Sequence, residues 1–340
     1  MCSLLFRPVI NIDICLLFNI LTRIMYLKNL YLYHRKGGLS SALENKAQTF
    51  YCNGQINSYY RVRSTQRALE EYAGDRISFE DLTPGWLTGV ENHWRCNGMR
   101  FTSINIYMKT LKSVVGDCVR CGMIPKEKYP FGRGLYEIPC ASSRKLAMTK
   151  EQIAKIVGYS GDTTVEKYRD LWLFSYLCNG INFRDMLFLR FANIENDEIT
   201  FVRSKTRHAK GEGQVIRAAI TPLMREIISK WGNTPGGDRN TFIFKYAKEG
   251  MTPIEITNVV REVTTLCNRN LRKLSVWLGL PHFTTYSARH SFATVLQRSG
   301  VNVSYISECL GHSSLSVTET YLAGFERKDR IKYSKYLTKV

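Results

Sequence analysis

The chain has 340 residues, and 48 Lys and Arg residues against 29 Asp and Glu residues give it a formal net charge of +19. At about 100–200 residues per domain, this length predicts two domains, each large enough to bury its own core. The hydrophobic content of 44% excludes a disordered chain. The excess of positive charge indicates a polyanionic partner, with nucleic acid favoured over an acidic membrane surface. The ten cysteines are scattered, several of them in apolar runs, as is typical of reduced thiols in the cytosol.

The N-terminal segment is apolar but does not predict a membrane span. Arg7, Asp13 and Arg23 interrupt it, so every apolar stretch is shorter than the roughly 18 residues that a spanning helix needs. Three interpretations stay open: a non-native or truncated extension with Met25 as the true start, an amphipathic arm, and a secretory or membrane signal. We therefore treat residues 1–45 as an extension of undetermined status.

Residues 46–140 are predicted to form a helical domain. Its clearest helix runs from Thr102 to about Cys121, where apolar residues such as Ile104, Met108 and Leu111 recur every three or four positions. An earlier helix, in INSYYRVRSTQRALEEYAG, interleaves arginine with tyrosine. Most of these basic side chains are expected to line a solvated face. Arginine and tyrosine also contact DNA phosphates and stack on nucleobases, so we expect this domain to contact DNA.

A basic linker, residues 141–148, is predicted to lead into a second domain, residues 149–340. Thr149 and Gln152 have the spacing of a capping box at the start of its first helix. Alternating β-branched residues predict two antiparallel strands, Glu198–Arg203 and Gln214–Ile220. A helix is expected over Phe183–Phe191, and further helices near Pro222–Trp231, Ile254–Trp277, Ser287–Ser299, Val303–Leu310, Ser316–Leu322 and Glu326–Leu337. The predicted fold class is mostly α with a small antiparallel β-sheet.

Three short motifs near the C-terminus carry the functional signal. ARHSFAT contains Arg289, LGH ends at His312, and ETY ends at Tyr321. In this order and spacing they resemble the C-terminal motifs of tyrosine recombinases, the phage integrase family. INSYYRVRSTQRALEEYAGDRISFEDL and MTKEQIAKIV resemble the core-binding domain and the start of the catalytic domain of Bacteroidetes-type members. The resemblance covers roughly residues 46–339, and it implies a helical, SAM-like core-binding domain followed by a catalytic domain.

The resemblance implies roles that elementary chemistry also favours. Rejoining a cut DNA strand without ATP requires a covalent intermediate, and Tyr321 is suited to be its nucleophile. Arg289 is expected to bind the phosphate through its bidentate guanidinium, and His312 to hydrogen-bond a phosphate oxygen. The resemblance places the catalytic lysine at the turn between two strands, where Lys205 would protonate the leaving 5′ oxygen. The same hairpin contains four further basic residues, namely Arg203, Arg207, His208 and Lys210.

Two positions depart from the family pattern. Where the family carries its first arginine, this chain has Asn182, which we expect to be a helix N-cap instead. Arg184 is a candidate substitute, although it lies about 200° away around a helix, and Arg190 is expected to make a backbone or structural contact. Three residues before Arg289 the family has His or Lys. Here it is Tyr286, whose hydroxyl can still hydrogen-bond a phosphate but is a poor general base at neutral pH.

We therefore expect a site-specific recombinase that cleaves and rejoins DNA through a 3′-phosphotyrosine, for inversion, integration or excision. The expected partner is double-stranded DNA with inverted-repeat core sites, bound by a homo-oligomer that is a tetramer in the synapse, with DNA-bending accessory proteins. No cofactor or metal is expected, because the sequence has no Walker A loop and no acidic cluster of a two-metal nuclease. The expected location is the cytoplasm, on the nucleoid. The alternatives are a catalytically impaired, recombinase-fold DNA-binding accessory protein and attachment to a membrane surface through the apolar N-terminus.

Overall fold

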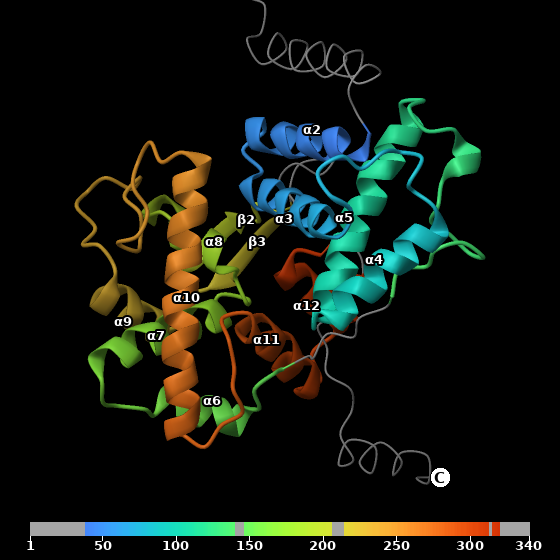
Figure 1. The fold of residues 1–340 in the computed structure, drawn as a ribbon. Helices are drawn as coiled ribbons and strands as arrows, with labels where there is room; N and C mark the ends of the chain where they lie inside the picture. The colour runs from blue at the N-terminus through green and yellow to red at the C-terminus, as the bar shows by residue number, and fades with distance from the viewer. Residues whose placement is uncertain (1–37, 140–145, 206–213, 313–314, 320–340) are drawn as a thin grey trace, which may run out of the picture. The chain divides into compact units, whose positions relative to one another are not determined.

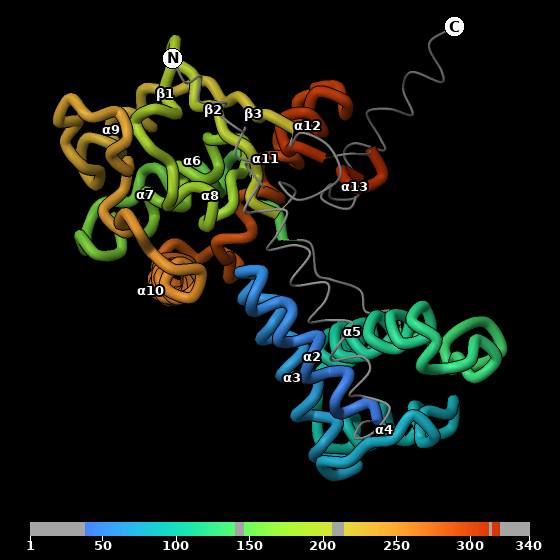
Figure 2. Tube along the Cα trace, turned by 90° about the horizontal axis from the view of Figure 1, so that it is seen from above, coloured from blue at the N-terminus to red at the C-terminus, as the bar shows by residue number. Residues whose placement is uncertain are grey.

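The structure, a computed structural model, describes residues 38–139, 146–205, 214–312 and 315–319. The chain divides into two compact units between Ser143 and Arg144 (Figures 1 and 2). Among the helices described, none has both the length and the apolar character needed to cross a bilayer.

The first unit is helical. Its elements are α2 (Leu39–Cys52), α3 (Ile56–Ala73), α4 (Pro84–Cys96), α5 (Phe101–Arg120) and the 3-10 turn η1 (Lys126–Lys128). Helices α2, α3 and α5 pack against one another around fully buried Leu43, Leu69 and Leu111. The predicted helix Thr102–Cys121 is confirmed as α5, shifted by one residue. Helix α2 begins at Leu39, whose side chain is fully buried, so the packed part of this unit starts before the Lys46 expected from the sequence.

The second unit is built around helix α7. Its elements are α6 (Lys150–Val157), α7 (Thr163–Leu177), α8 (Phe183–Leu187), η2 (Phe191–Asn193), β1 (Ile194–Glu195), β2 (Glu198–Val202), β3 (Val215–Ala219), α9 (Pro222–Trp231), α10 (Pro253–Trp277), α11 (Ser287–Arg298), α12 (Val303–Leu310) and α13 (Leu315–Glu319). Helix α7 contacts α9, α10 and α11. The indole of fully buried Trp172 on α7 donates to the Thr284 carbonyl oxygen at 3.1 Å and lies 3.2 Å from Ser287 Oγ, which fixes the start of α11.

The sheet of this unit is antiparallel, with the order β1-β2-β3 (Figure 2). Its inner face is formed by alternate residues, with Ile199 opposite Ala218 and Phe201 opposite Ile216. The two predicted strands are confirmed as β2 and β3, each slightly shorter than expected. Strand β1 was not predicted. It pairs with β2 across Asn196 and Asp197, which both have positive φ, the conformation that tight two-residue hairpins require.

The predicted helix Phe183–Phe191 is wrong in its second half. Helix α8 ends at Leu187, the backbone is extended at Arg190, with φ −110 and ψ 160, and Phe191 then begins the 3-10 turn η2. The Leu189 carbonyl oxygen accepts from Ile243 N at 2.7 Å, and Phe191 N donates to the Thr241 carbonyl oxygen at 3.0 Å. These backbone partners come from a distant segment, so pairing across the fold replaces the last helical turn that the local sequence favours.

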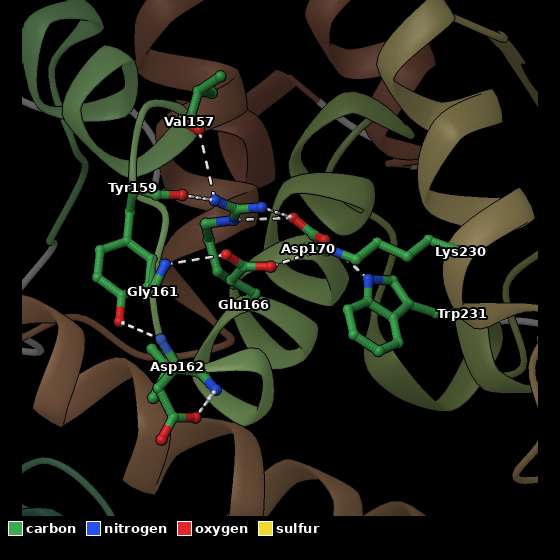
Figure 3. Close-up of polar contacts among 10 residues, drawn as sticks. Val157, Tyr159, Gly161, Asp162, Glu166, Asp170, Lys230 and Trp231 are labelled. Carbon is green, nitrogen blue, oxygen red and sulfur yellow. Dashed lines mark hydrogen bonds and ion pairs between the residues drawn. The ribbon is translucent and has the colours of Figure 1, made fainter.

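A buried carboxylate joins α7 to α9 (Figure 3). Asp170 is 3% exposed and accepts from Arg169 Nε at 2.8 Å and from Trp231 Nε1 at 2.7 Å. One turn earlier, Glu166 accepts from Lys230 Nζ at 2.7 Å. Buried charges are stable only when paired and hydrogen-bonded, and here both requirements are met. Helix α7 is therefore anchored on this side while its other end carries the turn that approaches α11.

Candidate active site

Arg289 is the centre of the site. It lies in the first turn of α11 and is only 3% exposed. Its Nη1 donates to the Gly180 carbonyl oxygen at 3.1 Å, and its Nη2 donates to the Leu310 carbonyl oxygen and lies 3.0 Å from His312 Nε2. Arginine does not lose its proton in proteins, so these contacts hold a permanent positive charge where three segments of the chain meet.

The approach of the α7–α8 turn to Arg289 requires glycine. Gly180 has φ +64, and a Cβ built there would lie 2.7 Å from the Arg289 Cα. Both the left-handed backbone and the close contact with another backbone exclude a side chain. The turn can therefore place the Gly180 carbonyl oxygen directly on the guanidinium.

His312 follows a left-handed glycine at the end of α12. Gly311 has φ 60 and ψ 48, and His312 N donates to the Ser307 carbonyl oxygen at 3.1 Å. This is a common way for a helix to end. It turns the imidazole back into the unit, where only 8% of the residue is exposed. The ring lies between Arg289 and Thr318 of α13, with Nδ1 2.9 Å from Thr318 Oγ1.

The contacts of His312 define its protonation. Because a guanidinium can only donate, Nε2 is the acceptor facing Arg289, and the proton of the neutral ring lies on Nδ1. Burial, and then the positive charges of Arg289, Arg203 and Lys205, together lower the pKa of His312 from 6.5 to about 4. At neutral pH the ring is therefore uncharged, and it cannot supply the imidazolium donor that a phosphate would otherwise attract.

Arg203 is a second buried arginine at this place. It directly follows β2, is 7% exposed, and its Nη1 lies 3.3 Å from the Leu310 carbonyl oxygen and 3.4 Å from that of Gly311. Two guanidinium groups thus converge on the end of α12. No role was predicted for Arg203. The strand alternation could have indicated one, because Arg203 continues the buried series of Ile199 and Phe201, and an arginine on the inward face of a strand is rarely solvated.

Lys205 is exposed and lies in the turn after β2. The turn starts at a fixed point, because Ser204 N donates to Asp185 Oδ1 of α8 at 3.0 Å. The positive charge of Lys205 contributes to the low pKa of His312, which places the lysine in the electrostatic environment of the site. The other bases of this hairpin, residues 207, 208 and 210, lie outside the described residues.

Asn182 and Arg184 occupy the start of α8. Asn182 has the N-cap position expected for it, with an extended backbone at φ −69 and ψ 147, but no side-chain cap hydrogen bond is present in this described helix. Arg184 is partly buried, and no hydrogen bond or ion pair joins its side chain to Arg289 or His312 within the described part of the chain. Arg184 as the substitute for the arginine that is absent at position 182 thus stays a prediction.

Tyr286 and Arg190 have different surroundings. Tyr286 is the residue before α11, is 52% exposed, and packs its ring edge-to-face against His290 with the centroids 4.9 Å apart. Arg190 stacks over the Phe242 ring at 4.0 Å and pairs with Glu249, so it makes the structural contact expected of it. Tyr321, the expected nucleophile, lies outside the described residues, which end at 319.

Taken together, the described residues form an anion-binding arrangement. Arg289 and Arg203 present charged, fork-shaped donors, which match the two non-bridging oxygens of a phosphodiester. Lys205 adds an exposed proton donor nearby. The fold and this cluster define a class of DNA-processing enzyme that holds phosphate with fixed cations.

Comparison with known families agrees with this class. The phage integrase family matches residues 147–327, and the phage integrase SAM-like domain matches residues 39–137. The first match alone covers more than half of the chain, so the chain belongs to the phage integrase family, the tyrosine site-specific recombinases.

Individual relatives show the extent of the similarity. A tyrosine recombinase of Thermosipho africanus is 24% identical over 293 residues, which are 83% of this chain and 87% of that protein. The tyrosine recombinase XerC of Rickettsia canadensis is 50% identical over 58 residues, 17% of this chain and 19% of that protein.

Two solved structures show the same fold. The Tn1549 transposon integrase in complex with a circular intermediate DNA has a TM-score of 0.65 at 16% identity, over 89% of this chain and 100% of that chain. A lambda integrase dimer bound to a COC′ core site has a TM-score of 0.55 at 17% identity, over 83% and 76%. The predicted fold class, mostly helical with a small antiparallel sheet and with a SAM-like domain before the catalytic domain, is confirmed.

Proposed function

We propose that this recombinase cuts and rejoins DNA through a covalent 3′-phosphotyrosine formed by Tyr321. The observation that carries the proposal is the convergence of buried Arg289, buried Arg203 and neutral His312 at the end of α12. Fixed cations in a water-poor site stabilise charge that develops on a phosphate far better than mobile surface cations do. The sequence that bears Tyr321 continues directly from the segment that contacts His312.

In the proposed reaction, every bond that forms is matched by one that breaks, and no external reactant is needed. The Tyr321 hydroxyl oxygen attacks the phosphorus while the bond from phosphorus to the 5′ oxygen breaks. The tyrosine proton is lost to solvent or a nearby base, and Lys205 protonates the leaving 5′ oxygen. Religation is the reverse, with a 5′ hydroxyl as the nucleophile and tyrosine as the leaving group. Tyrosine suits both directions because its phenol, with a pKa of about 10, leaves more readily than an alkoxide.

In this proposal Arg203 supplies the second guanidinium of the site, in place of the arginine that the family carries where this chain has Asn182. It is buried beside the same carbonyl oxygen as Arg289, whereas no hydrogen bond or ion pair joins Arg184 to Arg289 or His312 in the described part of the chain. Arg289 and Arg203 would each bind one non-bridging oxygen. Tyr286, exposed at the start of α11, would add a hydroxyl donor to the phosphate from outside the cluster.

The experiment that tests the function is trapping of the covalent intermediate. A nicked or half-site DNA with the inverted repeats that flank the gene should give a denaturant-resistant protein–DNA adduct with the wild-type chain. The adduct should disappear in Tyr321→Phe, while DNA binding in a gel-shift assay remains. Tyr305→Phe is the matched control, because Tyr305 is an exposed tyrosine of the same unit, on α12, that has no role in the proposed reaction. An adduct that persists in Tyr321→Phe would refute this assignment.

The assembly follows from the same proposal. Two protomers would bind the inverted repeats of one core site, and four would form the synapse, with DNA-bending accessory proteins assisting. The chain would act on nucleoid DNA in the cytoplasm, in inversion, integration or excision. Its core-binding sequence resembles that of Bacteroidetes-type recombinases, and we place it in that subgroup.

One observation favours a second candidate, a recombinase-fold protein that binds DNA without cutting it. Position 182, where the family carries an arginine, is an asparagine on an extended backbone at the start of α8. Such a protein would bind inverted repeats with a steep salt dependence but would give no adduct with the nicked DNA. The trapping experiment therefore distinguishes the two candidates directly.

A further inference from the structure

We propose that Thr318 is a positioning residue of this site, which accepts from His312 Nδ1 and so stabilises the tautomer of His312 that can accept from the Arg289 guanidinium. The proposal rests on the proposed function for its catalytic consequence, but its structural part stands on contacts among described residues. Thr318 lies on α13 and is fully buried, and its Oγ1 lies 2.9 Å from His312 Nδ1.

The hydrogen bonds run in one direction. Arg289 Nη2 donates to His312 Nε2 at 3.0 Å, so Nδ1 must carry the ring proton and donates to Thr318 Oγ1. If the hydroxyl were absent, Nδ1–H would lose this buried acceptor, and losing the partner of a buried donor costs more than the hydrogen bond itself contributes. The ring would then relieve this cost by moving its proton to Nε2 or by rotating.

Either response disturbs Arg289. A proton on Nε2 would face the Nη2 donor of the guanidinium, and two donors cannot share a hydrogen bond. Arg289 would have to shift away from His312, although its other donors are held by the carbonyl oxygens of Gly180 and Leu310. A small shift of a catalytic group is enough to slow a reaction that depends on alignment.

The position of Thr318 in the chain gives this contact a second consequence. His312 and Thr318 are six positions apart, and Tyr321 follows Thr318 by three positions. The hydroxyl therefore links the segment that leads to the proposed nucleophile with the side chains that hold the phosphate. A hydrophobic residue of the same shape would fill the same space but would leave the two parts unconnected.

Two substitutions separate the hydroxyl from the packing. Thr318→Val is nearly isosteric and removes the hydroxyl, whereas Thr318→Ser keeps it and removes a methyl group. Thr257→Val is the matched control: Thr257 is also a buried helical threonine of this unit, 4% exposed, and its hydroxyl donates to the Pro253 carbonyl oxygen at 2.8 Å. All three are made in the full chain.

The first readout needs no DNA. Nitrogen chemical shifts of ¹⁵N-histidine distinguish the Nδ1–H from the Nε2–H tautomer. We expect Nδ1–H at His312 in the wild-type chain, in Thr318→Ser and in Thr257→Val, and its loss or mixing in Thr318→Val. A pure Nδ1–H tautomer that persists in Thr318→Val overturns the proposal, whatever the enzyme does with DNA.

The second readout is the rate of adduct formation on nicked DNA. Thr318→Val should be slower by about tenfold, the equivalent of one buried hydrogen bond, with unchanged DNA affinity, and Thr318→Ser should restore most of the rate. Equal rates in Thr318→Val and Thr257→Val would overturn the positioning role. If the wild-type chain gives no adduct at all, the proposed function fails, and the tautomer measurement still decides whether Thr318 sets the state of His312.

Discussion

His312 should stay neutral at a pH where an ordinary histidine is charged. Burial, and then the positive charges of Arg289, Arg203 and Lys205, lower its pKa from 6.5 to about 4. These three cations and the hydroxyl of Thr318 are the charged and polar groups that face the ring in the described structure. The perturbation that tests this is a decrease in pH from 7.5 to 5.

The expected size follows from the two pKa values. At pH 5 a histidine with a pKa of about 4 is about 9% protonated, whereas one with a pKa of 6.5 would be about 97% protonated. The folded-state pKa lies below the unfolded one, so the unfolded chain takes up the proton first. The free energy of unfolding therefore decreases as the pH falls from about 6.5 to about 4, by roughly 2 kcal/mol at pH 5.

The assay is an NMR titration of the labelled imidazole rings. The chain has six histidines, and the signal that is missing in His312→Gln assigns the one of interest. Its ring shifts should stay constant down to about pH 5. The decrease in unfolding free energy over this range should also be roughly 2 kcal/mol smaller in His312→Gln than in the wild-type chain. A titration midpoint near 6.5 would refute the reasoning, because it would mean that neither burial nor the neighbouring cations act on the ring.

Two further predictions concern the groups around the ring. Arg203→Ala should slow adduct formation by about 10²–10³-fold, the usual effect of removing one donor to a developing charge, whereas Arg203→Lys, which keeps the charge but loses the fork, should be affected less. An unchanged rate in Arg203→Ala would mean that this arginine only supports the fold. Gly180→Ala should lower the melting temperature of the second unit more than Gly300→Ala, because both positions have positive φ but only at Gly180 would a Cβ lie within 3 Å of another backbone, that of Arg289. Equal melting temperatures would show that the turn can move away from α11 without cost.

The elements that were predicted correctly are those determined by interactions between residues close together in the sequence. The helix that became α5 has an unbroken apolar stripe, and Thr149 and Gln152 form the predicted capping box in α6. The exception, the second half of Phe183–Phe191, failed because its backbone partners, Thr241 and Ile243, come from a segment far along the chain. No periodicity within the segment could reveal that competition.

In the site, too, local sequence predicted some residues, and others became apparent only from the fold. Motif spacing was enough to select Arg289 and His312, which the structure brings to within 3.0 Å of each other. It could not select Arg203, because what distinguishes this arginine from its exposed neighbours is burial against the end of α12. Nor could it show the hydrogen bond from His312 to Thr318, since the two side chains come together only in the folded chain.

The carbonyl oxygen of Leu310 makes the arrangement of the two arginines depend on the backbone and not on a side chain. It lies within reach of the guanidinium groups of both Arg289 and Arg203, and it belongs to the backbone, so no substitution at position 310 can delete it. Its direction is set by the left-handed turn at Gly311. In the proposed reaction, a phosphate oxygen would replace this acceptor on side chains that are already ordered, so little conformational entropy would remain to be lost on binding. The resting arrangement of the two arginines therefore depends on the left-handed conformation of the glycine, and not on which side chain fills the space at position 310.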